Sequence, residues 1–411
     1  MRVCIIGAGI IGCSTAYALA RAGHEVVLLD EAALPAQAAS FANGAQLSYS
    51  YVQPLASPAT FLGLPSMLMS SRSPLVFQPR LDWRQWAWGV RFLAACTPGQ
   101  SRRGTRVLWE LAQRSRATLD EWRAGEDWEF SFARNGKLVL CPDAATLASQ
   151  RDQVTYQARL GAQQSVLSAA ECVAREPSLA ASRLPFAGGV WTEDECVADA
   201  AQLAEAMVNS LRRSGGQFRS RTKVTGWRTQ GDRVTAACVT TGGGEEEVEA
   251  DAFVVAAGVA ASGLVRGLGG SLPIYPIKGY SLTLKLQPGA VPPRASITDL
   301  GIKTVFAPLA GHLRVAAMVE IGGYETTVEP ERIRRMTEHV ESMFPGLTDP
   351  AADAKPWAGL RPATPDSLPI IGPSRRWSNL WLNVGHGALG LTLAAGSADQ
   401  IATELTHGRS G

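Results

Sequence analysis

Three glycines follow the first apolar run of the chain at the spacing G-x-G-x-x-G. Gly7, Gly9 and Gly12 come directly after Val-Cys-Ile-Ile at positions 3–6. A β-branched run of this kind is typical of a parallel strand buried on both faces. The first glycine permits a tight turn, the second lets the backbone approach a pyrophosphate, and the third lets the next helix pack closely. The spacing therefore predicts a strand–turn–helix unit that binds a dinucleotide.

The residues after the glycines complete this unit. Residues 14–22 are Ala-rich and predict a helix that stops at Gly23, and residues 24–30 predict a second strand. Asp30 ends that strand, where a carboxylate can accept a hydrogen bond from a ribose hydroxyl. A signal peptide is the alternative suggested by Arg2 and the apolar stretch. We disfavour it because its cleavage would remove the whole unit.

Composition narrows the class of protein. The chain has 411 residues, of which 46% are hydrophobic, and this is enough for two packed domains. Its net charge of +2 favours neither nucleic acid nor a strongly acidic partner. The seven cysteines are scattered without a C-x-x-C pair, and the five histidines show no ligand spacing, so we expect no disulfide framework and no metal. No apolar run is long enough to span a bilayer, and we expect a cytoplasmic protein.

A second glycine-rich junction lies near the end of the chain. Gly385, Gly387 and Gly390 stand between an apolar strand and the final helix. Residues 247–258 alternate, become apolar and end at a glycine, as buried strands beside a cofactor do. Two junctions at opposite ends of the chain indicate one long cofactor that reaches both, and FAD fits this better than NAD.

We therefore predict an α/β protein in which a discontinuous Rossmann-like FAD-binding domain is combined with a second, mixed-sheet substrate domain. Short alternating strands between residues 273 and 317 suggest the mixed sheet. The FAD-binding domain is expected to comprise residues 1–50, 195–265 and 355–411, and the substrate domain residues 51–194 and 266–354.

An aromatic stripe invites two interpretations. Trp83, Trp86, Ala87 and Val90 share one face of a predicted helix. Core packing is the favoured interpretation. Because arginines accompany the aromatics, contact with a membrane–water interface is the alternative, together with the apolar residues 61–69.

Two C-terminal segments resemble a known family. Residues 359–372 read Gly-Leu-Arg-Pro-Ala-Thr-Pro-Asp-Ser-Leu-Pro-Ile-Ile-Gly, and residues 379–390 read Asn-Leu-Trp-Leu-Asn-Val-Gly-His-Gly-Ala-Leu-Gly. Both are similar to the signature of FAD-dependent D-amino acid dehydrogenases, within the group of D-amino acid, glycine and sarcosine oxidases. Residues 276–283 and the pair Ser40 and Asn43 match the dehydrogenase branch. The family usually has Asn-Ala-Gly-Gln where this chain has Asn-Gly-Ala-Gln at 43–46, and Ala-Ala at 38–39 replaces a usual acidic-Thr pair.

The resemblance implies a set of catalytic residues. Arg361 matches the arginine that binds the substrate carboxylate in related oxidases, and arginine offers a bidentate fork for that purpose. Tyr280 and Tyr51 fall where related enzymes place phenols over the substrate, and His386 falls near the edge of the flavin ring. The alternatives are a structural arginine, a packed strand tyrosine and a core histidine.

The resemblance and the two junctions together imply a larger set of FAD-binding residues. These are Gly7, Gly9, Ile10, Ile11, Gly12, Asp30, Glu31, Ser40, Asn43, Gly44, Ala45, Gln46, Val224, Ala257, Gly258, Gly359, Gly385, His386, Gly387, Leu389, Gly390, Leu391 and Thr392.

The resemblance also implies a reaction. A D-amino acid would be deaminated to a 2-oxo acid and ammonia by hydride transfer to FAD, and the electrons would pass to a quinone or another acceptor. No dedicated base is needed, because the cofactor carries the difficult step. The nearest alternative is an oxygen-using oxidase of glycine, sarcosine or D-proline-like amines, and a flavin-binding sensor without turnover is the more distant one. A quinone acceptor would bring peripheral contact with the inner face of the cytoplasmic membrane.

Overall fold

A six-stranded sheet contains the glycine-rich unit of the N-terminus. In the computed structural model, which describes residues 1–69, 75–349 and 354–408, three distant parts of the chain supply its strands. The strand order is β10 (Gln217–Arg219), β2 (Glu25–Leu29), β1 (Arg2–Ile6), β14 (Ala252–Val255), β21 (Leu380–Val384) and β20 (Ile370–Pro373). All pairs are parallel except β20 with β21. The predicted return of the chain to the N-terminal unit is confirmed.

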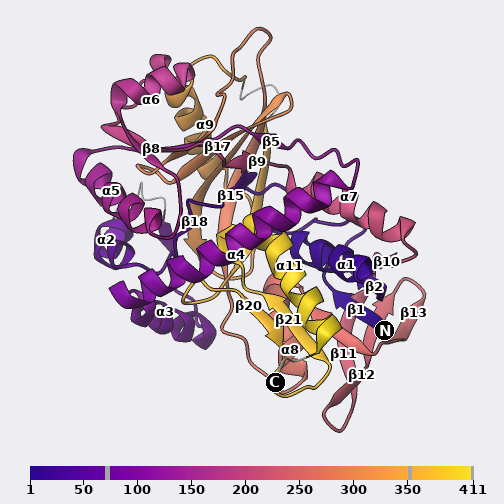
Figure 1. The fold of residues 1–411 in the computed structure, drawn as a ribbon. Helices are drawn as coiled ribbons and strands as arrows, with labels where there is room; N and C mark the ends of the chain where they lie inside the picture. The colour runs from indigo at the N-terminus through magenta and orange to yellow at the C-terminus, as the bar shows by residue number, and fades with distance from the viewer. Residues whose placement is uncertain (70–74, 350–353, 409–411) are drawn as a thin grey trace.

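Two layers cover this sheet. On one face the core contains residues of four helices, namely α1 (Ile10–Arg21), α4 (Pro98–Ala124), α7 (Ala200–Arg213) and α11 (Gly390–His407). The long helix α4 runs diagonally across the molecule beside α11 (Figure 1). On the other face the core includes residues of a three-stranded sheet, made of β11 (Lys223–Gln230), β12 (Arg233–Thr241) and β13 (Gly244–Glu249).

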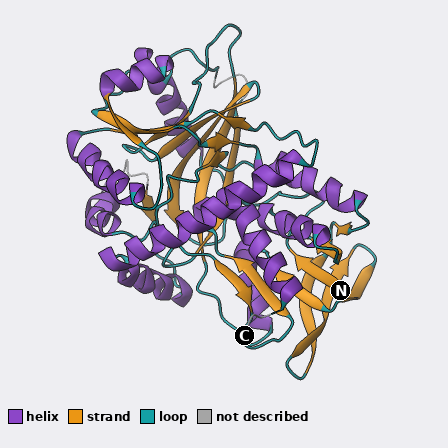
Figure 2. Cartoon of the chain, viewed as in Figure 1, coloured by secondary structure: helices purple, strands orange, loops and turns teal. Residues whose placement is uncertain are grey.

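A larger mixed sheet forms the second half of the molecule (Figure 2). Its order is β19 (Lys355–Ala363), β15 (Tyr275–Lys285), β18 (His312–Ile321), β17 (Thr304–Leu309), β16 (Ser296–Asp299), β6 (Lys137–Cys141), β8 (Gly188–Thr192) and β7 (Ser165–Ser168), with β4 (Leu75–Phe77) paired to β18. The pairs β16 with β6 and β18 with β4 are parallel and the rest are antiparallel. Leu282 of β15, Phe306 of β17 and Val340 of α9 (Pro330–Met343) belong to one hydrophobic core, here called the outer core, on the face of this sheet that packs against α9. The predicted mixed sheet is confirmed.

The remaining elements are short or peripheral. β3 (Gln46–Leu47), β9 (Cys196–Val197) and β5 (Ala133–Arg134) form a small sheet. The other elements are α2 (Pro58–Met69), α3 (Trp83–Ala95), α5 (Ala144–Ala158), α6 (Ala169–Arg175), α8 (Ala261–Gly267) and the 3₁₀ turns η1 (Pro177–Ala181), η2 (Gly258–Ala260) and η3 (Gly387–Leu389).

The segment 247–258 differs from its sequence-based prediction as one strand. It contains the end of β13 and the whole of β14, which belong to different sheets. The chain turns between them at residues 250–251, where the Asp251 carboxylate accepts a hydrogen bond from the Arg2 amide at 2.7 Å. The alternating and the fully apolar parts therefore belong to an exposed sheet and a buried one.

The aromatic stripe of α3 does not pack in the core, so that prediction is wrong. Trp83, Trp86 and Val90 are 72%, 52% and 67% exposed. The buried face carries Gln85 and Trp88 instead. The Trp88 indole donates to the Ala363 carbonyl oxygen at 2.8 Å, and the Gln85 amide donates to two backbone carbonyls. Both faces of α3 bear aromatic residues, so their spacing alone did not identify the inner face.

Candidate functional site

The glycine turn has the close packing that a dinucleotide site needs. Gly7 has a φ of 103°, and a Cβ there would lie 2.7 Å from the Ala257 Cα. A Cβ on Gly12 would lie 1.7 Å from the Gly7 carbonyl oxygen. Gly9 is the N-cap of α1 and provides no side-chain hydrogen bond to it. Because Gly9 has no side chain, the N-cap position leaves space at the amino end of α1, which suits a phosphate.

Asp30 is held beside this turn by backbone amides. Its two carboxylate oxygens accept hydrogen bonds from Ala8 N at 2.6 Å and Ala32 N at 2.8 Å. Burial raises the pKa of Asp30, and the two amides oppose that rise. Ser40 packs on the same turn, because its hydroxyl accepts the Ile10 amide at 3.1 Å.

Residues 43–48, here called the cofactor loop, run across the large sheet. The Asn43 carbonyl oxygen accepts a hydrogen bond from Arg314 of β18 at 3.1 Å. A Cβ on Gly44 would lie 3.5 Å from the Ala316 Cβ on the same strand. Further along, the Gln46 side chain contacts Thr298 of β16 at 3.3 Å. The loop therefore crosses from β18 toward β6 between the two halves of the molecule.

The C-terminal junction meets this loop. The Thr392 hydroxyl accepts the Ser48 amide at 3.0 Å and donates to the Gln46 carbonyl oxygen at 3.4 Å. Gly385 and Gly387 adopt positive φ values of 81° and 55°, and Leu389, the N-cap residue of α11, provides no side-chain hydrogen bond to the helix. Because β1, β14 and β21 are parallel neighbours, the two glycine-rich junctions predicted from the sequence follow the carboxyl ends of strands at one edge of the six-stranded sheet.

His386 carries an unpartnered polar atom in this region. The side chain is buried, and its Nε2 has no hydrogen-bond partner among the described residues. Burial lowers the pKa of His386 to about 3, so the ring is neutral near pH 7. Such an atom fits a cofactor that supplies the missing hydrogen bond. The His386 backbone also forms an antiparallel bridge with Ala363, two residues after Arg361.

Arg361 is a partly buried cation without a counterion. Within residues 1–69, 75–349 and 354–408, its guanidinium has no hydrogen-bond or ion-pair partner, and burial lowers its pKa. The guanidinium lies over Gly279 of β15, because a Cβ there would be 2.3 Å from its Nη2. An unpaired buried cation is costly unless an anion binds to it. This arrangement suits a carboxylate ligand.

Tyr280 lies on the other face of the same strand. It pairs directly with Ala358, whereas Gly279, under the Arg361 guanidinium, pairs with Gly359. Successive residues of a strand point to opposite faces. The Tyr280 hydroxyl donates to the Glu320 carboxylate at 3.0 Å within the outer core. The structure therefore does not bring Tyr280 together with Arg361.

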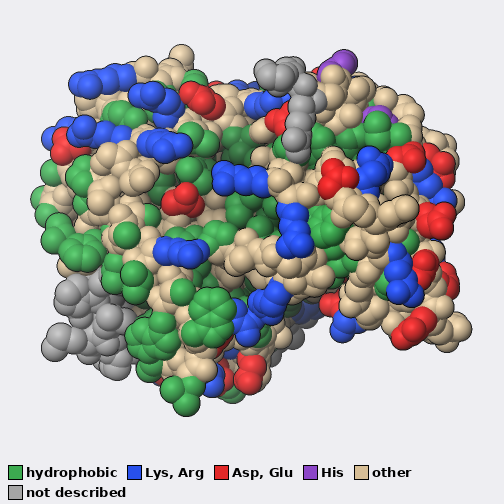
Figure 3. Space-filling view, turned by 90° about the horizontal axis from the view of Figure 1, so that it is seen from below, with side chains coloured by type: hydrophobic (Ala, Val, Ile, Leu, Met, Phe, Trp, Pro, Cys, Tyr) green, Lys and Arg blue, Asp and Glu red, His purple; other side chains and the backbone are tan. Residues whose placement is uncertain are grey.

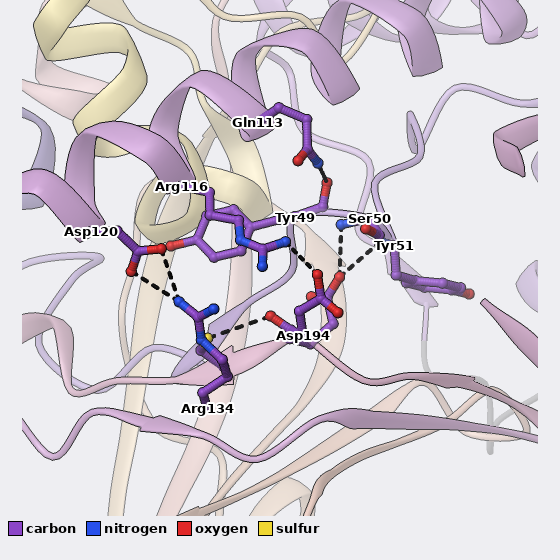
Figure 4. A network of polar contacts seen from close by, with 10 residues as sticks. Tyr49, Ser50, Tyr51, Gln113, Arg116, Asp120, Arg134 and Asp194 are labelled. Carbon is purple, nitrogen blue, oxygen red and sulfur yellow. Dashed lines mark hydrogen bonds and ion pairs between the residues drawn. The ribbon is translucent and has the colours of Figure 1, made fainter. Parts of the chain in front are cut away.

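Tyr51 lies near β6, five places from β19 in the strand order. Its ring lies over the Lys137 ammonium, with Nζ 4.7 Å from the centroid, and its hydroxyl donates to Gln150 at 3.2 Å. The Ser50 and Tyr51 amides both bond to the Glu195 carboxylate, at 2.7 and 3.2 Å. In Figure 4 the Tyr51 ring points away from the polar contacts of α4, among them the ion pair of Arg116 with Asp194 at 2.6 Å.

The remaining residues of the predicted FAD-binding set lie both at the two junctions and on other elements. Ile10, Ile11 and Gly12 open α1; Val224 is on β11; Ala257 and Gly258 follow β14; Gly359 is on β19; Gly390, Leu391 and Thr392 open α11; and Glu31 forms an exposed ion pair with Lys223 at 3.5 Å.

Two buried cations of the site were not predicted. Lys137 donates to Gln46 Oε1 at 2.9 Å and to Ser48 Oγ at 2.7 Å, and burial lowers its pKa to about 8. Arg314 pairs with Asp199 at 3.1 Å in addition to its bond to the cofactor loop. Lys137 is the single charged residue of β6, whereas Arg314 shares the mostly apolar β18 with Glu320; a charge within an apolar strand was the available signal.

Comparison with known proteins gives a consistent result. A family described as "FAD dependent oxidoreductase" matches residues 2–404. The chain is 44% identical to "D-amino acid dehydrogenase 2" of Ralstonia nicotianae, over 98% of this chain and 96% of the relative. It is 43% identical to the protein of that name from Pseudomonas aeruginosa, over 98% and 94%. Glycine oxidase from Bacillus cereus has the same fold, with a TM-score of 0.75, 21% identity and coverage of 100% and 96%.

Proposed function

Because the chain belongs to the family of FAD-dependent oxidoreductases, we propose that it oxidises D-amino acids to 2-oxo acids and ammonia. The single observation that supports the substrate site best is the Arg361 guanidinium, which has no counterion among the described residues. A free amino acid brings the carboxylate that this cation lacks. The relatives named D-amino acid dehydrogenase support the choice of the D series.

The chain's own residues bind and orient the reactants. Gly9 and the amino ends of α1 and α11 would hold the phosphates and the flavin of FAD. The neutral side chain of His386 would form a hydrogen bond at the flavin ring. Arg361 would bind the substrate carboxylate through two parallel hydrogen bonds and so fix the position of Cα. FAD supplies the acceptor for the hydride that leaves Cα.

The products balance without a protein base. Loss of a hydride from Cα and a proton from the amine gives an imine, and water converts the imine to the 2-oxo acid and ammonia. Tyr51 and Tyr280 are not part of this proposal, because their hydroxyls bond to Gln150 and Glu320.

Replacing Arg361 tests the substrate site. We expect Arg361→Ala to lower kcat/KM for D-amino acids by at least 100-fold while the FAD content stays the same, and Arg361→Lys to lose less. Unchanged kcat/KM in Arg361→Ala would refute the proposal. Peroxide production in air, compared with reduction of a quinone, separates an oxidase from a dehydrogenase.

The electron acceptor in this proposal is a quinone in the cytoplasmic membrane, and α3 is the proposed contact. No helix among the described residues is both long and apolar enough to cross a bilayer. Leu93 lies on the outer face of α3 together with Trp83, Trp86 and Val90. Leu81, which precedes the helix, is fully exposed. Phe61 and Leu62 of α2 are exposed as well, whereas the side chains of residues 64–69 lie outside the described set.

The charge around this face complements an anionic bilayer. Residues 75–109 contain six arginines and one acidic residue, although the whole chain has a net charge of only +2. Figure 3 shows apolar side chains with basic ones among them on the underside of the molecule. Amphipathic surfaces rich in tryptophan and arginine bind such interfaces.

Vesicle binding tests this contact separately from catalysis. The holoenzyme should co-sediment with vesicles containing phosphatidylglycerol more than with phosphatidylcholine vesicles. Trp83→Ser with Trp86→Ser should abolish this, whereas Val291→Ser, at a residue exposed elsewhere, should not. Equal vesicle binding by the double variant and the wild type would contradict the membrane contact. A change of oligomeric state in solution that accompanies the loss of vesicle binding would also contradict it, because it would identify this face as a contact between copies of the chain.

A further inference from the structure

A pair of glycines faces each other beneath the proposed substrate site. In the register of β15 and β19, Gly279 lies directly opposite Gly359. The same face carries Ile277 opposite Arg361 on one side of the pair and Ser281 opposite Trp357 on the other. Cross-strand partners share a face of the sheet, so two adjacent strands are bare of side chains at this point.

Two large side chains lie across this bare area. A Cβ on Gly279 would stand 2.3 Å from Arg361 Nη2, 2.6 Å from Cζ and 3.0 Å from Nε. A Cβ on Gly359 would stand 1.8 Å from the Trp357 ring. The guanidinium and the indole therefore rest directly on the backbone, each on a different glycine.

We infer that Gly279 is a positioning residue for Arg361. This inference rests on the proposed role of Arg361 in carboxylate binding. Ordinary van der Waals contacts of a Cβ begin near 3.4 Å, whereas Arg361 Nη2 would stand at 2.3 Å, so a methyl group at position 279 would displace the guanidinium by about 1 Å. A displacement of that size away from the reacting geometry can lower a rate by about 100-fold.

The backbone of Gly279 does not itself require glycine. Its φ is outside the positive range that side chains avoid, whereas many other glycines of the chain have positive φ. Alanine is compatible with an ordinary strand conformation, so Gly279→Ala acts on the Arg361 side chain rather than on the fold. Gly226 of β11 is a matched control, because a Cβ there makes only an ordinary contact of 3.8 Å with Cys238.

The test compares Gly279→Ala, Arg361→Ala and the double variant as holoenzymes. The binding probe is propionate, a carboxylate that cannot be deaminated, and its dissociation constant is measured from the change in flavin absorbance. Gly279→Ala should raise that constant and the KM for a D-amino acid at least tenfold, with a smaller change in kcat. The double variant should bind no more weakly than Arg361→Ala, and Gly226→Ala should match the wild type.

The outcomes separate this inference from the proposed function. If Arg361→Ala binds propionate normally, the proposed role of Arg361 fails and this inference fails with it. If Arg361→Ala weakens binding but Gly279→Ala does not, or if the two losses multiply, only the inference is overturned.

Should Gly279→Ala not fold, Gly279→Ala in an Arg361→Lys background gives the same comparison, because the narrower ammonium avoids the methyl group. That pair should equal Arg361→Lys alone, and a further tenfold loss would overturn the inference.

Discussion

The Thr392 hydroxyl accepts a hydrogen bond from the Ser48 backbone amide at 3.0 Å, across a sequence separation of 344 residues. Both residues are buried. The bond, with the second one to Gln46, attaches the first turn of α11 to the cofactor loop. A single side chain therefore couples the C-terminal glycine-rich junction to the cofactor loop, which contains four residues of the predicted FAD-binding set.

Thr392→Val tests this coupling, because it keeps the shape of the side chain and removes the hydroxyl. The Ser48 amide and the Gln46 carbonyl then lose a partner in a buried place, which costs about 1–3 kcal/mol. We expect a lower thermal unfolding midpoint and weaker FAD retention on gel filtration. Thr392→Ser, which keeps the hydroxyl, should retain FAD as the wild type does; equal loss in both variants would contradict a role for the bond.

The cofactor loop carries backbone strain at a position that can be relieved. Ala45 has a φ of 55°, in the left-handed region, and its side chain is fully buried. A left-handed conformation costs a non-glycine residue about 1–2 kcal/mol. Gly44, one position earlier, has no positive φ and has room for a methyl group beside Ala316.

Exchanging these two residues should therefore stabilise the protein. Ala45→Gly removes the strain, and Gly44→Ala recovers about 0.4–1 kcal/mol by restricting the unfolded chain. The double variant should have a higher thermal midpoint than either single one. A lower midpoint for Gly44→Ala would show that the methyl group clashes with Ala316.

Lys137 and Glu195 form a buried charged couple whose members depend on each other. Burial raises the pKa of Glu195, whereas Lys137 opposes that rise. Lys137→Met leaves Glu195 as a buried charge without its cation, and we expect a loss of about 3 kcal/mol in stability. Lys137→Met with Glu195→Gln should recover much of it in denaturant unfolding. Equal destabilisation in the single and double variants would show that the two charges are not coupled.

The same lysine gives a pH signature. The pKa of Lys137 in the folded protein, about 8, is below its ordinary value of 10.5, so the unfolded chain binds more protons between these two pH values. Stability from this group therefore rises with pH through that window and is constant above it. The slope should vanish in Lys137→Met, and its persistence would assign it to another group.

Local patterns predicted the glycine turn and α1 well, because Gly7 and Gly12 contact each other within a few residues. The position of Gly279 under Arg361 was not predictable in this way. It depends on the register of two strands whose residues are about eighty positions apart, and spacing within one strand carries no information about its partner.

Two other expectations depended on which face of an element a residue occupies. Tyr280 was expected at the site, and its strand was predicted, but a shift of one residue along a strand moves a side chain to the other face. For α3, the inner face is set by the bond from Trp88 to Ala363, a residue 275 positions away. Periodicity identified the helix and could not identify the surface on which it packs.

We expect His386 to act only as a neutral group. Its folded pKa of about 3 is below the ordinary value of 6.5, because the buried ring loses the hydration that would stabilise its charge. Its contribution to stability is therefore complete above pH 6.5 and declines as the pH falls from there toward 3. Denaturant unfolding of the wild type at pH 7 and pH 4.5 should show a loss that is smaller in His386→Gln. Between pH 7 and 9 the pH profile of kcat/KM should have the same shape in both proteins, since neither ring nor amide ionises there. A profile whose shape changes on replacement would instead identify His386 as a titrating group of the reaction.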